Sequence, residues 1–172
     1  ELITGYGPLV GIWFDVPHAF DRARGERVIR FVRSLQPDIL VNNRTGAPGD
    51  FDTPEQHVGR FQNMRPWESC ITLGTQWTWK PNDTIKPYTD AVRILVACAV
   101  GDGNLALNTN PTPDGQIELR QVENFRKIGV WLKQYGESIY GTRGGPFVAP
   151  GAGAVKAHGG SFALPGGAWW GG

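Results

Sequence analysis

Short apolar runs of strand length alternate in this chain with segments of helical periodicity, and this alternation restricts its fold most. The predicted strands cover residues 9–14, 38–42, 70–73 and 104–108. The predicted helices, with apolar residues at i, i+3, i+4 spacing, cover residues 28–35, 87–100 and 116–132. Strands that alternate with helices in this way predict a parallel sheet built from βαβ units.

The number of predicted strands and the chain length together favour half of a barrel. A (β/α)8 TIM-like barrel has eight strands and takes about 250 residues, whereas this chain has 172 residues. We therefore predict an α/β fold in which residues 1–142 form the C-terminal strands and helices of such a barrel. An open doubly wound sheet is the competing interpretation, and it too places functional residues at the carboxyl ends of strands.

The composition changes after Thr142. Residues 143–172 contain ten glycines and show no helical periodicity. This segment is predicted to be an irregular Gly/Ala-rich tail, or the truncated start of a β-sandwich domain.

Charge and hydropathy exclude some classes of partner. The formal net charge is only +1, with lysine and arginine scattered, which does not favour nucleic acid or a membrane surface. No stretch approaches the roughly 20 apolar residues of a membrane helix. A half-barrel would expose two open strand edges, so homo-oligomerisation stays possible.

Two carboxylates stand where an α/β fold displays its chemistry. Asp15 ends the first predicted strand, where it is either a functional group, a helix N-cap or a partner in a loop salt bridge. Glu55 follows the Gly- and Pro-rich loop after the second strand; by itself, such a glutamate is usually just solvated. Two carboxylates at neighbouring strand ends have the layout of glycoside hydrolysis, in which a separation of about 5–5.5 Å indicates a retaining enzyme.

Other side chains near these acids suit a sugar ligand. Arg44, at the end of the second strand, offers a fork of donors for hydroxyl groups, or forms a structural ion pair with Asp50 or Asp52. Glu68 is a rival acid or a buried structural carboxylate. Tryptophan rings that could stack on a sugar, although each by itself fits the core better, are Trp13, Trp67, Trp77 and Trp79.

Several other types of site lack their signatures. His18, His57 and His158 have no zinc-ligand spacing, so we expect no metal and no cofactor. The chain has no Gly-x-Ser-x-Gly elbow and no phosphate-binding loop. Cys70 and Cys98 are predicted to be small buried hydrophobes, although a disulfide stays open.

Five sequence blocks resemble glycoside hydrolase family 29, the α-L-fucosidases, and they occur in that family's order. They are Trp13-Phe14-Asp15, Asn42-Asn43-Arg44, the loop 49–56, Trp67-Glu68-Ser69-Cys70, and residues 103–115. The resemblance implies a retaining hydrolase that releases terminal α-L-fucose, with fucosylated glycans as substrates and a periplasmic or secreted parent enzyme.

The resemblance also implies roles for individual residues. Asp15 would be the nucleophile and Glu55 the acid/base, with Glu68 as the alternative acid/base. Trp13 and Arg44 would contact fucose, and Trp67 lies in a matching block. Two departures from the family are the missing N-terminal strands, which carry sugar-gripping histidines, and Val16, where glycine is common.

Two other functions remain open on the sequence. The chain could be a catalytically incompetent fragment or a carbohydrate-binding remnant, in which case Asp15 would lie on an open face rather than in a closed pocket. It could also belong to a retaining hydrolase that acts on a different sugar.

Overall fold

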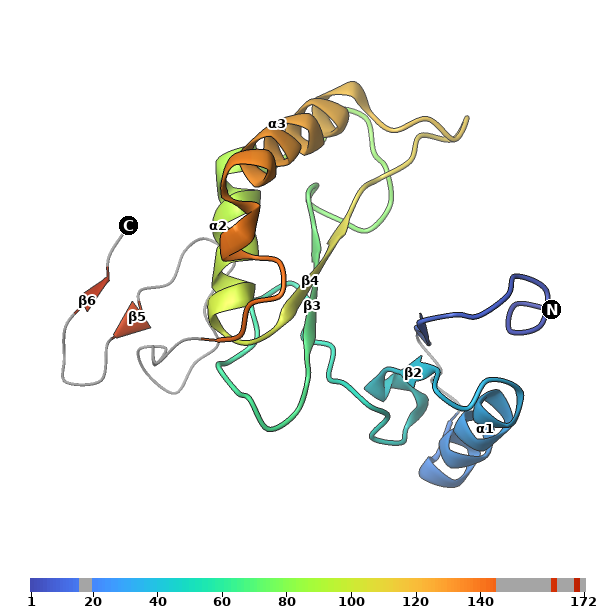
Figure 1. The fold of residues 1–172 in the computed structure, drawn as a ribbon. Coiled ribbons are helices and arrows are strands. Elements are labelled where there is room, and N and C mark those ends of the chain that lie inside the picture. The colour runs from blue at the N-terminus through green and yellow to red at the C-terminus, as the bar shows by residue number, and fades with distance from the viewer. Residues whose placement is uncertain (16–19, 145–161, 164–168, 171–172) are drawn as a thin grey trace. The chain divides into compact units, whose positions relative to one another are not determined.

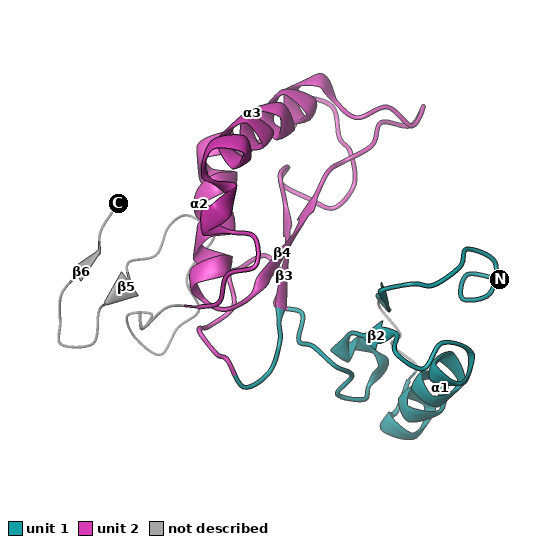
Figure 2. Cartoon of the chain, in the orientation of Figure 1, with its two compact units in different colours: residues 1–53, 64–67 teal, residues 54–63, 68–172 magenta. Residues whose placement is uncertain are grey.

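The computed structural model describes residues 1–15, 20–144, 162–163 and 169–170, and its elements are labelled in Figure 1. The chain divides into two compact units (Figure 2). Unit 1 comprises residues 1–53 and 64–67, and unit 2 comprises residues 54–63 and 68–172.

Unit 1 is built on one parallel βαβ arrangement. Strand β1 (Gly11–Ile12) pairs in parallel with strand β2 (Leu40–Val41), and helix α1 (Arg22–Leu35) connects them. Asp21 caps α1, because its carboxylate accepts the Arg24 N–H at 2.7 Å. A short 3-10 helix, η1 (Asn43–Thr45), follows β2. The core of this unit consists of Ile29, Val32, Ile39, Val41 and Ala47.

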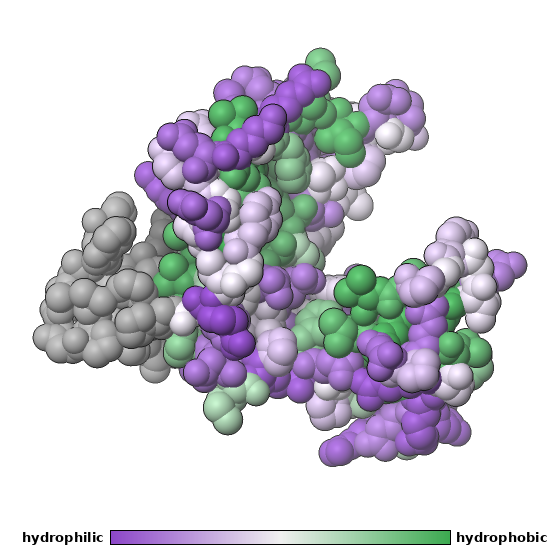
Figure 3. Space-filling view, viewed as in Figure 1, coloured by the Kyte–Doolittle hydropathy of each residue, from purple (hydrophilic) through white to green (hydrophobic). Residues whose placement is uncertain are grey.

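The sequence prediction for unit 1 is right in element type and order, but it overstates the burial. Residues 9–14 were expected to form a buried strand, yet only two of them are paired and Val10 is 85% exposed. Among the described residues β1 has one strand neighbour, so little covers it. Phe31 and Leu35, placed on the buried face of α1 by their spacing, are 63% and 41% exposed. The outer side of α1 is otherwise hydrophilic (Figure 3).

Unit 2 contains the longer parallel pair. Strands β3 (Glu68–Thr72) and β4 (Asn104–Asn108) pair over five residues each, with Cys70 opposite Ala106. Helices α2 (Tyr88–Val100) and α3 (Leu119–Tyr135) pack on each other, and the 3-10 helix η2 (Gly136–Ser138) follows. Leu73, Ala91, Val92 and Ile128 are buried at their centre. Parallel pairing within an α/β chain is therefore confirmed in both units.

Helix α3 begins later than its periodicity predicts. Pro111 forms an isolated antiparallel β-bridge with Ile117, and the Thr112 hydroxyl donates to the Gln116 carbonyl at 2.9 Å. The turn before α3 therefore extends to residue 117. Leu119, expected on the apolar face, is 82% exposed at the start of the helix.

Most of the predicted irregular tail, 145–161, 164–168 and 171–172, lies outside the described residues. The two described pieces of it, β5 (Phe162–Ala163) and β6 (Trp169–Trp170), form an antiparallel pair. No helix in the described part of the chain is long and apolar enough to cross a bilayer.

A buried carboxylate closes the loop that follows β3. Asp83 is 3% exposed and accepts hydrogen bonds from the Thr75 hydroxyl at 2.5 Å and the Thr75 N–H at 3.0 Å. Lys80 forms an ion pair with it at 3.3 Å. The Thr75 hydroxyl contributes most to lowering the pKa of Asp83, from 3.8 to about 2, and this outweighs the opposing effect of burial.

This pKa predicts acid-sensitive stability of unit 2. Because the folded-state pKa is depressed, the contribution of Asp83 is fully present above pH 3.8 and is lost as the pH falls toward 2. We expect Asp83→Asn to lower the urea midpoint at pH 6, and the gap from wild type to shrink toward pH 2. Urea unfolding followed by circular dichroism at several pH values measures this gap. A gap that is constant with pH would contradict the assignment.

Candidate functional site

The candidate site lies in unit 1, where β1 and β2 end side by side. Asp15 follows β1 by three positions, and Arg44 follows β2 within η1. Because the two strands are parallel, their carboxyl ends are neighbours. Arg44 Nη1 donates to Asp15 Oδ1 at 2.9 Å, so the structure brings together two residues that are 29 positions apart. The Asp15 side chain keeps 57% of its surface exposed, which leaves room for a ligand to approach the carboxylate.

Trp13 and Thr53 hold Arg44 in place beside Asp15. Its guanidinium carbon lies 4.5 Å from the centre of the Trp13 ring, in a cation–π contact. Its Nε donates to the Thr53 hydroxyl at 2.9 Å, and that hydroxyl donates to Asn43 Oδ1 at 2.8 Å. With its rotation restricted in this way, the guanidinium presents Nη1 to Asp15 in one orientation.

The other acids of the loop have their own arginine partners. Asp50 pairs with Arg33 at 2.5 Å, and Asp52 pairs with Arg65 at 2.8 Å. The interpretation of Asp15 as a helix N-cap is wrong, because Asp21 caps α1. The interpretation of Asp15 as a partner in a loop salt bridge agrees with its contact to Arg44. Such a contact is also compatible with a functional carboxylate.

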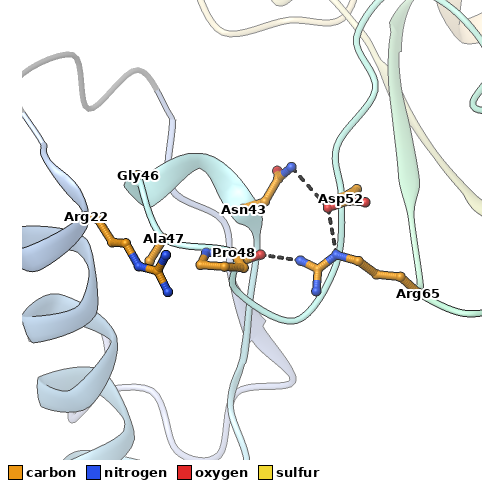
Figure 4. Close-up of a pocket in the computed structure, with 7 residues that line it drawn as sticks. All are labelled: Arg22, Asn43, Gly46, Ala47, Pro48, Asp52 and Arg65. Atoms are coloured by element: carbon orange, nitrogen blue, oxygen red, sulfur yellow. Dashed lines mark hydrogen bonds and ion pairs between the residues drawn. The ribbon is translucent and has the colours of Figure 1, made fainter.

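A polar cavity lies in the same unit (Figure 4). It has a volume of about 490 Å³ and is lined by Arg22, Asn43, Gly46, Ala47, Pro48, Asp52 and Arg65. In Figure 4 the Arg65 guanidinium lies between the Asp52 carboxylate and the Pro48 carbonyl, and it donates to both. Asn43 donates to the same carboxylate at 3.2 Å.

Glu55, in unit 2, lies on a well-anchored stretch of backbone. The Cys70 N–H donates to the Pro54 carbonyl at 2.8 Å, and the Gln56 N–H donates to the Cys70 carbonyl at 2.9 Å. These bonds fix both flanks of Glu55 against β3, and the residue itself is exposed. Gln56 has a positive φ of 57°, and its amide bonds to Thr72. The glycine- and proline-rich sequence before it gave no sign of this pairing.

The two remaining candidates, Glu68 and Trp67, differ in exposure. Glu68 is the first residue of β3, lies opposite Asn104 and is half-buried. Trp67 is 1% exposed, which supports its interpretation as a core residue over that of a sugar-binding platform. Its indole N–H is buried and has no acceptor among the residues the structure describes.

Sequence reasoning missed the roles of Asn42 and Thr53. Asn42 is fully buried, and its side-chain amide bonds to the backbone of Phe14, the residue before Asp15. Thr53 supplies the hydroxyl that holds Arg44. In the sequence, Asn42 is the last residue of a predicted strand and the first of the block Asn42-Asn43-Arg44, and neither position indicates a contact with Phe14.

No cluster of three or more His, Cys, Asp or Glu side chains that could hold a metal occurs among the described residues. Neither cysteine forms a disulfide. Burial raises the pKa of Cys98 to about 12, so this thiol stays protonated and inert.

Comparisons with known proteins agree on one family. The family model described as Alpha-L-fucosidase matches residues 1–137. Plasma alpha-L-fucosidase from Rattus norvegicus is 38% identical over 157 residues, covering 83% of this chain and 34% of that protein. Relatives such as this one are about three times longer than the matched region, so the chain spans about a third of their length.

Solved structures give the same result. Alpha-L-fucosidase isoenzyme 1 from Paenibacillus thiaminolyticus superposes with a TM-score of 0.79 at 29% identity, over 95% of this chain and 42% of that one. The alpha-L-fucosidase from Vibrio sp. strain EJY3 gives a TM-score of 0.76 at 26% identity, over 85% and 28%. Sequence blocks, family model and fold thus agree, and the chain belongs to the alpha-L-fucosidase family.

Proposed function

We propose that this chain carries the nucleophile of a retaining α-L-fucosidase, which releases terminal α-L-fucose from fucosylated glycans by double displacement. One observation carries the proposal: Asp15, Arg44 and Trp13 meet at the carboxyl ends of two paired parallel strands. The alpha-L-fucosidase names of its relatives supply the substrate class.

The same comparisons support a barrel for the whole fold. Both parallel pairs, β1–β2 and β3–β4, have the direction required in a (β/α)8 barrel. Ninety-five per cent of the chain superposes on a solved fucosidase. We infer that residues 1–142 form part of such a barrel, with Asp15 and Arg44 at the carboxyl ends of its strands.

In the first step of the proposed reaction, the Asp15 carboxylate attacks the anomeric carbon and Glu55 gives its proton to the departing glycosidic oxygen. A covalent fucosyl ester on Asp15 results. In the second step Glu55 removes a proton from water, which attacks the anomeric carbon and releases Asp15. The two displacements each invert the anomeric centre, so the α configuration is retained.

Arg44 and Trp13 have supporting roles in this proposal. Arg44 orients the Asp15 carboxylate and offers its remaining donors to fucose hydroxyls. Trp13 supports the guanidinium through the cation–π contact and would contact fucose beside it. Glu68 stays the alternative acid/base, since its half-buried carboxylate is compatible with that role.

A second candidate function is carbohydrate binding without turnover. The exposure of Asp15, 57% of its side chain, favours this candidate, because a catalytic carboxylate normally lies in an enclosed pocket. A retaining hydrolase acting on another sugar is a third candidate that keeps the same carboxylates.

Aryl glycoside hydrolysis separates the three candidates. The chain should release nitrophenol from 4-nitrophenyl α-L-fucoside and not from the matching α-L-rhamnoside or β-D-galactoside. Proton NMR of the first-formed sugar should show the α anomer. Nitrophenol release from only one of the other glycosides would show that the chain acts on that sugar and not on fucose. Saturable fucose binding without nitrophenol release would show that the chain binds carbohydrate without turnover.

Arginine at position 44 should not be replaceable by lysine. Arg44→Lys keeps the charge but loses the Nε bond to Thr53 and the planar stack on Trp13. We expect kcat/KM for the aryl fucoside to fall about 10- to 100-fold, because a hydrogen bond to a charged group contributes about 1.5–3 kcal/mol.

Thr53→Val is the matched control for this prediction. It removes the hydroxyl that accepts from Nε and donates to Asn43, but it keeps the guanidinium of Arg44, so its loss of kcat/KM should be smaller than that of Arg44→Lys and in the same direction. Steady-state kinetics of both variants give the comparison. Wild-type kinetics in Arg44→Lys would show that turnover does not need the planar guanidinium of Arg44.

A further inference from the structure

The side chain of Asn42 makes an unusual pair of contacts across the ends of β1 and β2. Its Oδ1 accepts the Phe14 N–H at 2.9 Å, and its Nδ2 donates to the Phe14 carbonyl at 2.7 Å. Both polar ends of one amide therefore bond to the backbone groups of one residue. The side chain is 0% exposed, so water does not compete for either bond.

This clamp begins where the strand ladder stops. The pairing of β1 with β2 ends at Ile12 opposite Val41, and the clamp joins the next residue of one strand, Asn42, to Phe14 of the other. A buried amide is costly unless it is hydrogen-bonded, so packing alone would favour an apolar residue here. The amide extends the connection between the two strands beyond the last backbone pair.

The clamped residue leads directly into Asp15. The Phe14 carbonyl that Asn42 holds belongs to the peptide group whose nitrogen is that of Asp15, so the clamp fixes the plane of that peptide. Two residues after Asn42, Arg44 holds the carboxylate of Asp15. One short segment after β2 thus holds Asp15 at its backbone and at its side chain.

We propose that Asn42 is a positioning residue for the Asp15 carboxylate, acting through the Phe14 peptide. The inference rests on the proposed function, because Asp15 must be the nucleophile for its position to affect the rate. It predicts that loss of the Asn42 amide slows the attack of Asp15 without changing how fucose binds.

Chemical rescue distinguishes a positioning role from a structural one. In an Asp15→Gly background, added azide attacks the anomeric carbon from the free side; the new carbon–nitrogen bond forms as the aryl oxide leaves with the bonding electrons. The product is β-L-fucosyl azide. This reaction does not use the Asp15 carboxylate, so it should not depend on the Asn42 clamp.

The test compares Asn42→Ala, the milder Asn42→Thr and the control Val41→Ala in this chain. Val41 directly precedes Asn42 and is equally buried, but its apolar side chain cannot hydrogen-bond to the Phe14 backbone. We expect Asn42→Ala to lower kcat for the aryl fucoside about 100-fold at unchanged KM, since small misplacements of reacting groups cost about that much. Asn42→Thr should lose less in the same direction. Azide rescue of Asp15→Gly should change by less than about threefold when Asn42→Ala is added.

A structural role would give a different pattern. If Asn42→Ala and Val41→Ala lower kcat equally, or if azide rescue falls as much as hydrolysis does, the positioning role is overturned. Wild-type hydrolysis by Asp15→Gly would instead refute the proposed function, and so the two failures are distinguishable.

A readout that needs no turnover completes the test. In NMR spectra of the chain, the Phe14 amide should be protected from hydrogen exchange, and the Arg44 side-chain protons should lie close to the Asp15 β protons. Both signals should weaken in Asn42→Ala and persist in Val41→Ala. An Asp15–Arg44 contact that is unchanged in Asn42→Ala would contradict the inference.

Discussion

Replacing Asp15 with alanine is expected to abolish hydrolysis of aryl α-L-fucosides, with kcat reduced at least about a thousandfold, as for other removed nucleophiles. The carboxylate is the group that would form the covalent ester, and Arg44 Nη1 donates a hydrogen bond to it at this strand end. The measurement is nitrophenol release by the purified chain and its variant, with circular dichroism to confirm that both are folded.

Asp52→Ala is the matched control for this variant. Asp52 also forms an ion pair with an arginine, Arg65, in the same unit. However, it belongs to the loop after η1 and not to the end of β1. Its replacement should leave kcat within about tenfold of wild type if only the carboxylate at Asp15 attacks the sugar. Equal losses in the two variants would indicate a general effect of removing an ion pair from unit 1.

Replacing Glu55 with glutamine should slow hydrolysis according to the leaving group. A general acid contributes about 10²- to 10⁴-fold, and it contributes most when the departing oxygen is strongly basic. Phenyl α-L-fucoside should therefore lose most of its kcat/KM in Glu55→Gln, whereas 2,4-dinitrophenyl α-L-fucoside, which needs no proton, should lose little. Steady-state rates over a series of aryl fucosides give the slope against the leaving-group pKa.

Glu68→Gln is the control, since Glu68 is the rival acid/base and is 13 positions further along the chain. If Glu55 is the acid, Glu68→Gln should lower all rates by a similar and smaller factor. A steep leaving-group dependence in Glu68→Gln, with none in Glu55→Gln, would transfer the role to Glu68.

Much of the fold could be predicted from the sequence, because hydrophobic periodicity and breakers act locally. The strand at residues 104–108 was placed to the residue, and the helix at 87–100 was placed to within one residue at its start. The errors lie at positions whose burial depends on which other segments cover them. Val10 and Phe31 are apolar residues in the right pattern, but neither has a covering neighbour among the described residues.

Less of the candidate site could be predicted, because its contacts join distant segments. The strand ends predicted that Asp15 and Arg44 would be neighbours, and the structure places them 2.9 Å apart. The sequence held no signal that Thr53 would hold Arg44, or that Asn42 would clamp Phe14, since Asn and Thr in loops usually bond to nearby backbone. Trp67 is buried, which agrees with the interpretation of this ring as part of the core.

The most direct test of the account is to trap the covalent intermediate that it requires. The chain would be incubated with 2-deoxy-2-fluoro-α-L-fucosyl fluoride, whose fluorine slows the second step, and its mass and peptide map would be measured. The account predicts one fluorofucosyl group per chain, bound through an ester to Asp15, and no label in Asp15→Ala. A label on another carboxylate, or turnover of aryl fucoside with inversion and no label, would contradict it.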